Sequence, residues 1–159
     1  MRLEGTRPNC CSSRRLLTLD GRPWGEVVGR AFGESCEVRI TGRGRYHLVK
    51  KGSWKSRFDL QEGETGEVLA SVESGAFEKG WRILLPGGVG CVLQPDGVFK
   101  QGFTAFDETG ARIAKVSVRG ACSDDIIATA DGAIDPLDLL VLLLVYNIVA
   151  TRRAAAAAS

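Results

Sequence analysis

Apolar and polar residues alternate over short segments along most of this chain, and glycine-containing pairs separate the segments. A period of two predicts strands with one buried face, and pairs such as Asp-Gly favour the tight turns that join them. Because no helical pattern lies between the segments, we predict an antiparallel barrel or sandwich. The predicted strands are residues 16–19, 26–30, 36–41, 45–50, 54–60, 67–73, 81–85, 90–94, 98–106, 112–119 and 125–129.

One segment near the C-terminus departs from this pattern. Residues 137–150 are apolar on every side of a helix, which excludes a surface helix with one wet face. Asp135 is a favoured N-cap, Pro136 a favoured first helical residue, and Asp138 places a carboxylate at the positive end of the helix dipole. We therefore predict a helix over about 136–150, roughly 22 Å long at 1.5 Å per residue.

Such a helix must be surrounded by lipid or by protein. A membrane span asks for about 20 apolar residues, and Asp138 and Asn147 would each be costly in lipid. A tail anchor would also carry Arg152 and Arg153 across the membrane, against the usual distribution of positive charge. These features favour a helix buried in protein, with a membrane anchor as the alternative.

An internal repeat connects the strands with the helix. Residues 64–72 and 108–116 share Glu-Thr-Gly-x-x-(Leu/Ile)-Ala-x-Val, and each follows a Phe-Asp pair. A repeated hairpin closes a barrel without exposed edges. We therefore predict a mainly β protein, a closed antiparallel β-barrel of about 10–12 strands enclosing the hydrophobic C-terminal α-helix. Residues 15–151 would form this single domain, between a disordered tail over 1–14 and an Arg/Ala-rich tail over 152–159.

The hairpin units and the Asp-Pro-Leu-Asp start of the apolar run together resemble the tubby C-terminal-like fold, in particular its LURP-one-related and phospholipid-scramblase-like branches. The resemblance covers about residues 16–150 and implies a barrel around a hydrophobic helix. Tubby domains bind phosphoinositide headgroups through basic residues on the barrel surface, and scramblase-like members are associated with membranes and calcium. LURP-one-related proteins have no settled biochemical activity, so the resemblance implies a fold more firmly than an activity.

Composition narrows the class of protein. A net charge of +2 gives no general attraction to nucleic acid, and none is expected as a partner. The first residues are polar, so no signal peptide is expected. Five cysteines without a Cys-x-x-Cys pair indicate reduced thiols and a cytoplasmic location. Cys36, Cys91 and Cys122 are predicted core residues, whereas Cys10 and Cys11 are acylation candidates for which an incidental pair is the favoured interpretation.

A basic segment is the best surface signal. No acidic residue lies between Arg39 and Phe58, and strand alternation puts Lys55 and Arg57 on the face opposite Trp54 and Phe58. Such a face suits phosphate or an anionic membrane; the alternative, slightly favoured, is a solvated face with edge lysines. The candidate lipid- or phosphate-binding residues are Arg39, Arg43, Arg45, Lys50, Lys51, Lys55 and Arg57.

Acidic residues gather before the helix, where the resemblance implies a calcium-associated segment. Asp124, Asp125 and Asp131 are weak calcium candidates. Their spacing matches no EF-hand loop, the asparagine-phenylalanine run of scramblase-like proteins is missing, and Asp135 and Asp138 already have roles at the helix start. We favour structural roles for these carboxylates and expect no metal and no cofactor.

Catalytic constellations are sparse. His47 is the only histidine, and the sequence has no Gly-x-Ser-x-Gly elbow and no P-loop ending. We therefore expect no enzyme. The leading hypothesis is a cytoplasmic barrel, in peripheral contact with membranes, that binds phospholipid headgroups or an anionic membrane. The alternatives are an integral scramblase-like protein anchored by its C-terminal helix, and a scaffold for protein interactions without a small ligand.

Overall fold

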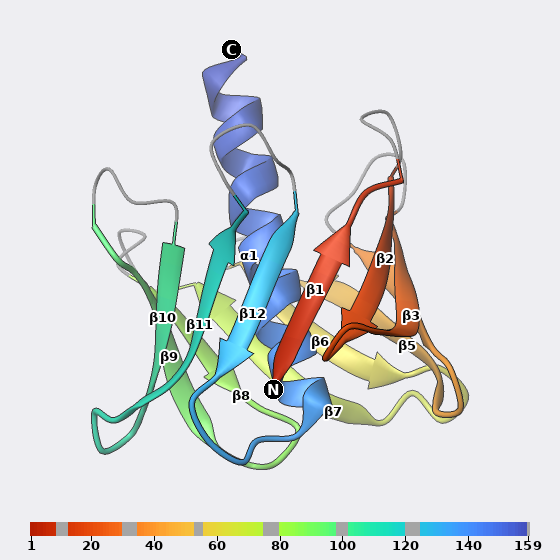
Figure 1. Ribbon diagram of the computed structural model, residues 1–159, viewed down its shortest axis with the longest axis horizontal. Coiled ribbons are helices and arrows are strands. Elements are labelled where there is room, and N and C mark those ends of the chain that lie inside the picture. Colours follow the sequence, from red (N-terminus) through yellow and green to blue (C-terminus); the bar gives the residue numbers. More distant parts are fainter. Residues whose placement is uncertain are drawn as a thin grey trace.

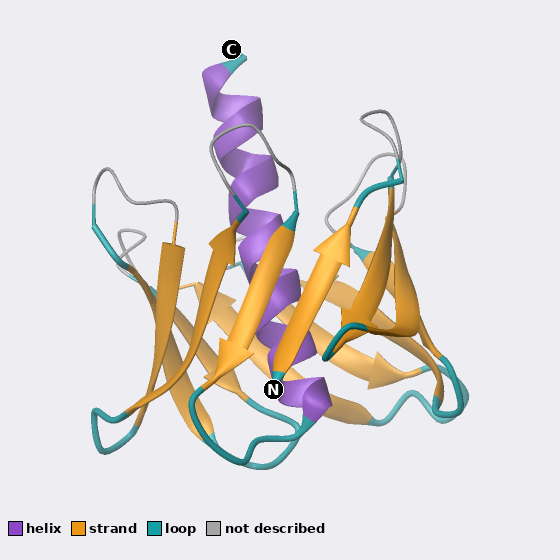
Figure 2. Ribbon diagram, in the orientation of Figure 1, coloured by secondary structure: helices purple, strands orange, loops and turns teal. Residues whose placement is uncertain are grey.

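The computed structural model describes residues 1–8, 13–29, 35–52, 56–74, 80–97, 102–119 and 125–158. These residues form a closed antiparallel barrel and one helix (Figures 1 and 2). The strands are β1 (Arg2–Thr6), β2 (Arg14–Leu19), β3 (Arg22–Gly29), β4 (Cys36–Ile40), β5 (Gly44–Lys51), β6 (Arg57–Glu62), β7 (Val68–Ser74), β8 (Trp81–Leu84), β9 (Gly90–Pro95), β10 (Gly102–Asp107), β11 (Arg112–Val118) and β12 (Ile126–Ala130), and the helix is α1 (Pro136–Ala157).

Each strand pairs with the next along the chain, and β1 pairs with β12 to close the barrel. The barrel therefore has two distinct ends. We call the end with the hairpins at 20–21, 41–43, 63–67, 85–89 and 108–111 the turn end; the segment 131–135 leads from it into α1. The opposite end, where the helix leaves the barrel and extends beyond the strands, is the exit end (Figure 1).

The predicted fold class is confirmed, because a closed antiparallel barrel surrounds the C-terminal helix and each predicted strand has a counterpart. The predicted disordered tail over 1–14 is contradicted at residues 2–6, which form β1, while residues 9–12 of that range lie outside the described residues. Residues 2–5 pair with β12, residues 3–6 pair with β2, and Leu3 is fully buried. The two inward positions of β1 are Leu3 and Gly5, so only one of them carries a large apolar side chain. This alternation is too weak for the strand to be recognised from sequence.

The predicted helix end and C-terminal tail also need correction. The helix continues through Arg152 and Arg153 to Ala157, well beyond the expected end at residue 150. Alanine has the highest helix propensity, so the alanine run extends a helix that is already nucleated inside the barrel. Measured by length and composition, Pro136–Ala157 could cross a membrane, yet half of its apolar window is buried within the barrel.

The core lies between the helix and the inward faces of the strands. The helix residues from Leu139 to Val145 are at most 2% exposed, and burying one such aliphatic side chain stabilises the fold by about 1.5–3 kcal/mol. The helix is off-centre and packs most closely on β12, β1 and β11. That wall presents Gly5, Ala114 and Ala128 inward, whereas the opposite side holds bulkier residues such as Phe58 and Trp81.

The internal repeat encodes a turn. Glu62 accepts hydrogen bonds of 2.7 Å from both the backbone N–H and the hydroxyl of Thr65. In the second copy, Asp107 accepts bonds of 2.9 and 2.6 Å from the same two groups of Thr109. The glycine after each threonine has a φ of +72° or +83°, which other residues rarely adopt. A carboxylate-capped hairpin therefore occurs twice around the barrel.

Candidate functional site

The basic residues predicted from sequence do not share one face. Strand β5 crosses the height of the barrel, so Arg45 starts near the turn end and Lys51 reaches the exit end. Arg39 and Arg43 lie with Arg45 in the turn half, while Arg57 lies beside Lys51 in the strand register. Lys50 is exposed at the exit end, one position before Lys51. The candidate Lys55 falls outside the described residues.

Carboxylates from outside the basic segment pair with part of this set. Arg39 points outward, as the alternation predicts, but its Nε lies 2.7 Å from Oε1 of Glu37 and its Nη1 3.6 Å from Oε1 of Glu26. In the turn half, Arg43 approaches Oδ1 of Asp135 at 3.4 Å. Glu37 lies two residues before Arg39 on the same strand, whereas the contacts with Glu26 and Asp135 depend on β3 and on the segment before α1, which the sequence of the basic segment does not show.

Arg57 has similar partners. Its Nε lies 3.4 Å from Oδ1 of Asp59, and its Nη1 lies 4.0 Å from Oε1 of Glu73 on β7. Asp59 also accepts a hydrogen bond of 3.1 Å from the Ser71 hydroxyl. Arg57 is therefore held along the outer wall, and no described carboxylate lies within ion-pair distance of Lys51 beside it.

The exit end has a second basic group, which the sequence analysis assigned to a tail. The guanidinium carbon of Arg152 lies 5.4 Å from the ring centre of Trp81 and 5.8 Å from that of Phe58. Its Nη2 donates a hydrogen bond of 3.0 Å to the Ser56 hydroxyl. Cation–π contacts of this kind fix a guanidinium in place without removing its charge.

Arg153 is placed in the same way on the next part of the wall. Its guanidinium carbon lies 5.4 Å from the ring centre of Phe103, which in turn makes an edge-on contact of 5.5 Å with Tyr146. No described carboxylate lies within ion-pair distance of Arg153. The two arginines therefore present positive charge at the rim while their side chains cover buried aromatic rings.

A pocket of about 290 Å³ lies between this part of the helix and the ends of β6 to β10. We call it the mouth pocket. From the helix it is lined at positions 149, 152, 153 and 156, which are spaced on one face. Among the described residues its lining is Ser56, Ser74, Trp81, Pro95, Phe103, Val149, Arg152, Arg153 and Ala156, and none of these is acidic.

The two ends of the barrel differ in charge. Each end comprises the two terminal residues of every strand there, the segments beyond them and the adjoining end of the helix. The described charged residues of the exit end are Arg7, Arg14, Arg15, Lys50, Lys51, Arg57, Arg82, Arg119, Arg152 and Arg153, against Glu37, Glu73, Asp96 and Asp125. Those of the turn end are Asp20, Glu62, Glu64, Glu67, Asp107, Glu108, Asp131, Asp135 and Asp138, against Arg2, Arg22, Arg39, Arg43, Arg45 and Arg112. The turn-end acids include the residues that cap the hairpins and the helix, so turn chemistry contributes to this polarity.

The calcium candidates do not converge. Asp125 precedes β12 at the exit end, Asp131 follows it at the turn end, and Asp124 lies outside the described residues. Six residues of extended chain separate two positions by roughly 20 Å. Asp131 is also paired with Nε of Arg112 at 2.6 Å. Within the described ranges, no three His, Cys, Asp or Glu side chains could jointly hold a metal ion.

The other two acidic residues before and at the helix, Asp135 and Asp138, cap its first turn. Asp135 accepts a bond of 2.9 Å from the Leu137 N–H, and Asp138 accepts one of 3.3 Å from the Asp135 N–H, which completes a capping box. Asp138 also accepts a bond of 3.2 Å from the Gly87 N–H. Burial raises the pKa of this carboxyl above its ordinary value. Both predicted helix-start residues are confirmed.

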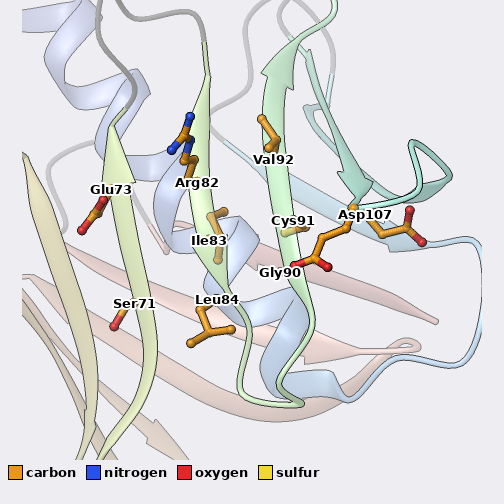
Figure 3. Close-up of a pocket in the computed structure, with 10 residues that line it drawn as sticks. Ser71, Glu73, Arg82, Ile83, Leu84, Gly90, Cys91, Val92 and Asp107 are labelled. Atoms are coloured by element: carbon orange, nitrogen blue, oxygen red, sulfur yellow. The ribbon is translucent and has the colours of Figure 1, made fainter.

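A shallow groove of about 360 Å³ crosses the outer wall from β7 to β10 (Figure 3). Glu73 and Arg82 line it beside Leu84, which is 53% exposed. Its lining includes two potential nucleophiles, Ser71 and Cys91. The Ser71 hydroxyl donates a hydrogen bond to Asp59, and burial raises the pKa of the Cys91 thiol to about 12, so this thiol stays protonated near neutral pH. The groove lining contains no histidine to act as a base.

The other predicted residues fall where their types suggest. Cys36 and Cys91 are buried, as expected for core cysteines, whereas Cys10, Cys11 and Cys122 lie outside the described residues. His47 is half-buried on β5, opposite Glu37 in the register.

Comparison with family models, with curated proteins and with solved structures finds no match to this chain.

Proposed function

We propose that this protein is a non-enzymatic barrel that binds anionic phospholipid membranes through its exit end. The observation that carries the proposal is the difference in charge between the two ends of the barrel, with arginines and lysines around the helix exit and carboxylates around the hairpins. Near an anionic bilayer, each Lys or Arg contributes about 1 kcal/mol of attraction, which falls off within a Debye length. The same field repels the acidic turn end and so orients the barrel.

The twelve-stranded barrel around a C-terminal helix is compatible with the tubby-like resemblance, which implies the same class of ligand. The binding surface proposed here differs from the segment 39–57 expected from sequence. It keeps Lys50, Lys51 and Arg57, adds Arg152 and Arg153, and leaves out the turn-half residues.

Support for an integral membrane protein is weaker. The helix satisfies the length of a span, but its apolar side chains are already covered by the barrel walls. Moving it into lipid would expose the inward faces of the strands to water, and would place Asp138 and Asn147 in hydrocarbon. The peripheral arrangement needs neither change.

Co-sedimentation with vesicles tests the proposal. We expect binding to phosphatidylcholine vesicles that contain phosphatidylserine, little binding to pure phosphatidylcholine, and weakening by salt. Replacing Lys50 and Lys51 together by Glu should reduce binding at least tenfold, because about 2 kcal/mol of attraction becomes repulsion. The matched control, Arg22→Glu with Arg45→Glu, makes the same charge change at the turn end and should have little effect.

If both double variants lose the same amount of vesicle binding, the interaction depends only on the net charge of the protein. That result would contradict binding through the exit end. Binding that does not depend on anionic lipid would contradict the proposal altogether.

A further inference from the structure

The mouth pocket combines two kinds of wall. Arg152 and Arg153 lie on the helix side, and the serine hydroxyls of Ser56 and Ser74 lie at the ends of the strands. The rest is apolar or aromatic and includes Trp81 and Phe103, which are 6% and 3% exposed. We propose that this pocket binds the phosphate group of an amphiphilic phosphate ester, with both guanidiniums on the phosphate and the apolar wall against the rest of the molecule.

The arginines have the chemistry that phosphate requires. A guanidinium is planar, remains charged at every physiological pH and presents N–H groups in a fork that matches phosphate oxygens. The guanidinium of Arg152 lies over the rings of Trp81 and Phe58, which leaves its charge in place. Its Nη2 donates a hydrogen bond to Ser56, which helps to hold the guanidinium in position before a ligand arrives.

The pocket is also suited to more than a bare phosphate ion. Its volume of about 290 Å³ approaches the lower end of small-molecule sites, which are about 300–1,000 Å³ and mostly apolar with a few polar groups. Trp81, Pro95, Phe103 and Val149 supply the apolar part. Because no described residue of the lining is acidic, these walls favour an anion and disfavour a cationic or zwitterionic group next to the arginines.

The location connects the pocket with the membrane. It opens beside α1 at the exit end, the same end that carries the basic rim, so an ester embedded in a bilayer that the rim contacts is within reach of the arginines. This inference rests on the proposed function and makes the mouth pocket its headgroup site. A soluble phosphate ester with an apolar or aromatic group has the same chemistry, so the experiment must separate the two sources.

Three probes make that separation with the full chain: inorganic phosphate, a phosphatidic acid with two short acyl chains that stays monomeric, and phosphatidylcholine vesicles with a minor fraction of long-chain phosphatidic acid. Calorimetry measures affinity for the two soluble probes, and co-sedimentation measures binding to the vesicles. The indole N–H signal of Trp81 in a proton–nitrogen NMR spectrum, assigned with Trp81→Phe, reports whether a probe enters the mouth pocket.

Arg152→Gln and Arg153→Gln each remove one guanidinium group from the pocket, and Arg22→Gln is the matched control at the turn end. Each pocket variant should weaken short-chain phosphatidic acid by about tenfold or more, since hydrogen bonds to charged groups are the strong ones. Arg152→Lys keeps the charge but loses the planar fork, so it should recover only part of the affinity. Circular dichroism checks that every variant retains the fold.

The inference is supported if the short-chain lipid shifts the Trp81 signal, binds more tightly than inorganic phosphate, and is weakened by the pocket variants alone. It is overturned, while the proposed function stands, if vesicles bind but the pocket variants bind the short-chain lipid as well as the unmodified chain does. If the short-chain lipid binds in the pocket and vesicles do not, the ligand is a soluble ester and the proposed membrane function is wrong. Equal affinities for inorganic phosphate and the short-chain lipid would contradict the role of the apolar wall.

Discussion

Nε of Arg15 on strand β2 donates a hydrogen bond of 3.1 Å to Oδ1 of Asn147 on the helix, inside the barrel and across 132 positions of the chain. Arg15 is 6% exposed, and its Nη1 also reaches the carbonyl oxygen of Gly5 at 3.4 Å. This contact explains the one amide in the apolar part of the helix. It also fixes the rotation and height of the helix against β1 and β2.

We expect Asn147→Leu to lower the free energy of unfolding by about 1–3 kcal/mol, because it removes an acceptor from a buried guanidinium. Urea unfolding measures the change. Ala155→Leu, at an exposed position on the same helix, should stay within about 0.5 kcal/mol. In a double-mutant cycle with Arg15→Met, the two substitutions should not be additive; additive effects would show that the pair is not coupled.

Leu143 tests the position of the helix. Its side chain is fully buried, so Leu143→Ala should cost about 2–5 kcal/mol of unfolding free energy. Leu84→Ala, the same substitution at an exposed position on β8, should change it by less than about 0.5 kcal/mol. A chain that ends at Ile134 would lack the core of the barrel and should aggregate. If that truncated chain instead stays soluble and folded, the helix is not the core.

The buried thiols predict a stability that falls at alkaline pH. Burial raises the pKa of both Cys36 and Cys91 to about 12, so in the folded state they keep their protons while the unfolded chain loses them near pH 9. Stability is therefore complete below about pH 9 and is lost as the pH rises toward 12, by about 1.4 kcal/mol per pH unit for each thiol.

Replacing Cys36 and Cys91 together by Ala should flatten this part of the stability profile, measured by urea unfolding between about pH 8 and pH 10. Both thiols should also react slowly with Ellman's reagent in the native protein and rapidly after denaturation. Equal alkaline slopes for the variant and the unmodified chain would contradict the assignment.

The capped hairpins predict the opposite dependence at acidic pH. Hydrogen bonds from Thr65 lower the pKa of Glu62, and those from Thr109 lower the pKa of Asp107. Each carboxylate therefore contributes stability that is present above its pKa in the unfolded chain, about 4, and is lost as the pH falls through the lower folded value. Glu62→Gln and Asp107→Asn should each be less stable at neutral pH, and the difference should disappear in acid.

Thermal unfolding followed across the acidic range checks these two variants. Glu64→Gln is the matched control, because within the described residues Glu64 joins this turn through its backbone N–H and not through its side chain. A difference between either variant and the unmodified chain that persists at the lowest pH would argue against the charge-assisted cap.

Much of the fold could be predicted because its signals are local. Three examples each depend on residues within one turn or strand. They are the alternation in β5, the alternation in β4 of inward Val38 and Ile40 with outward Arg39, and the caps at Asp135 and Asp138. Strand β1 gave no such signal, because its inward positions are only Leu3 and Gly5 and one of its two partner strands, β12, lies more than 100 positions away. The end of the helix was also misplaced, because an exposed alanine run is helical only as an extension of a buried segment.

The candidate site was predicted less well than the fold. Lys51 and Arg57 were chosen from a run of basic residues, and they do lie side by side. The sequence could not show that Glu26 and Asp135 reach the arginines at the other end of that run, or that Arg152 covers Trp81. A signal was available in the helical spacing of Val149, Arg152 and Ala156, but it has meaning only once the helix is known to continue.

The sequence by itself determined the strands other than β1, the hairpins and an apolar helix that needs protein on every side, because alternation, turn residues and caps act between near neighbours. The tertiary structure alone decided which charges pair, which end of the barrel is basic and which aromatic rings support the arginines. Those properties arise when closure of the barrel brings together residues from strands that are distant in the chain, and Coulomb and ring contacts depend on that spatial separation.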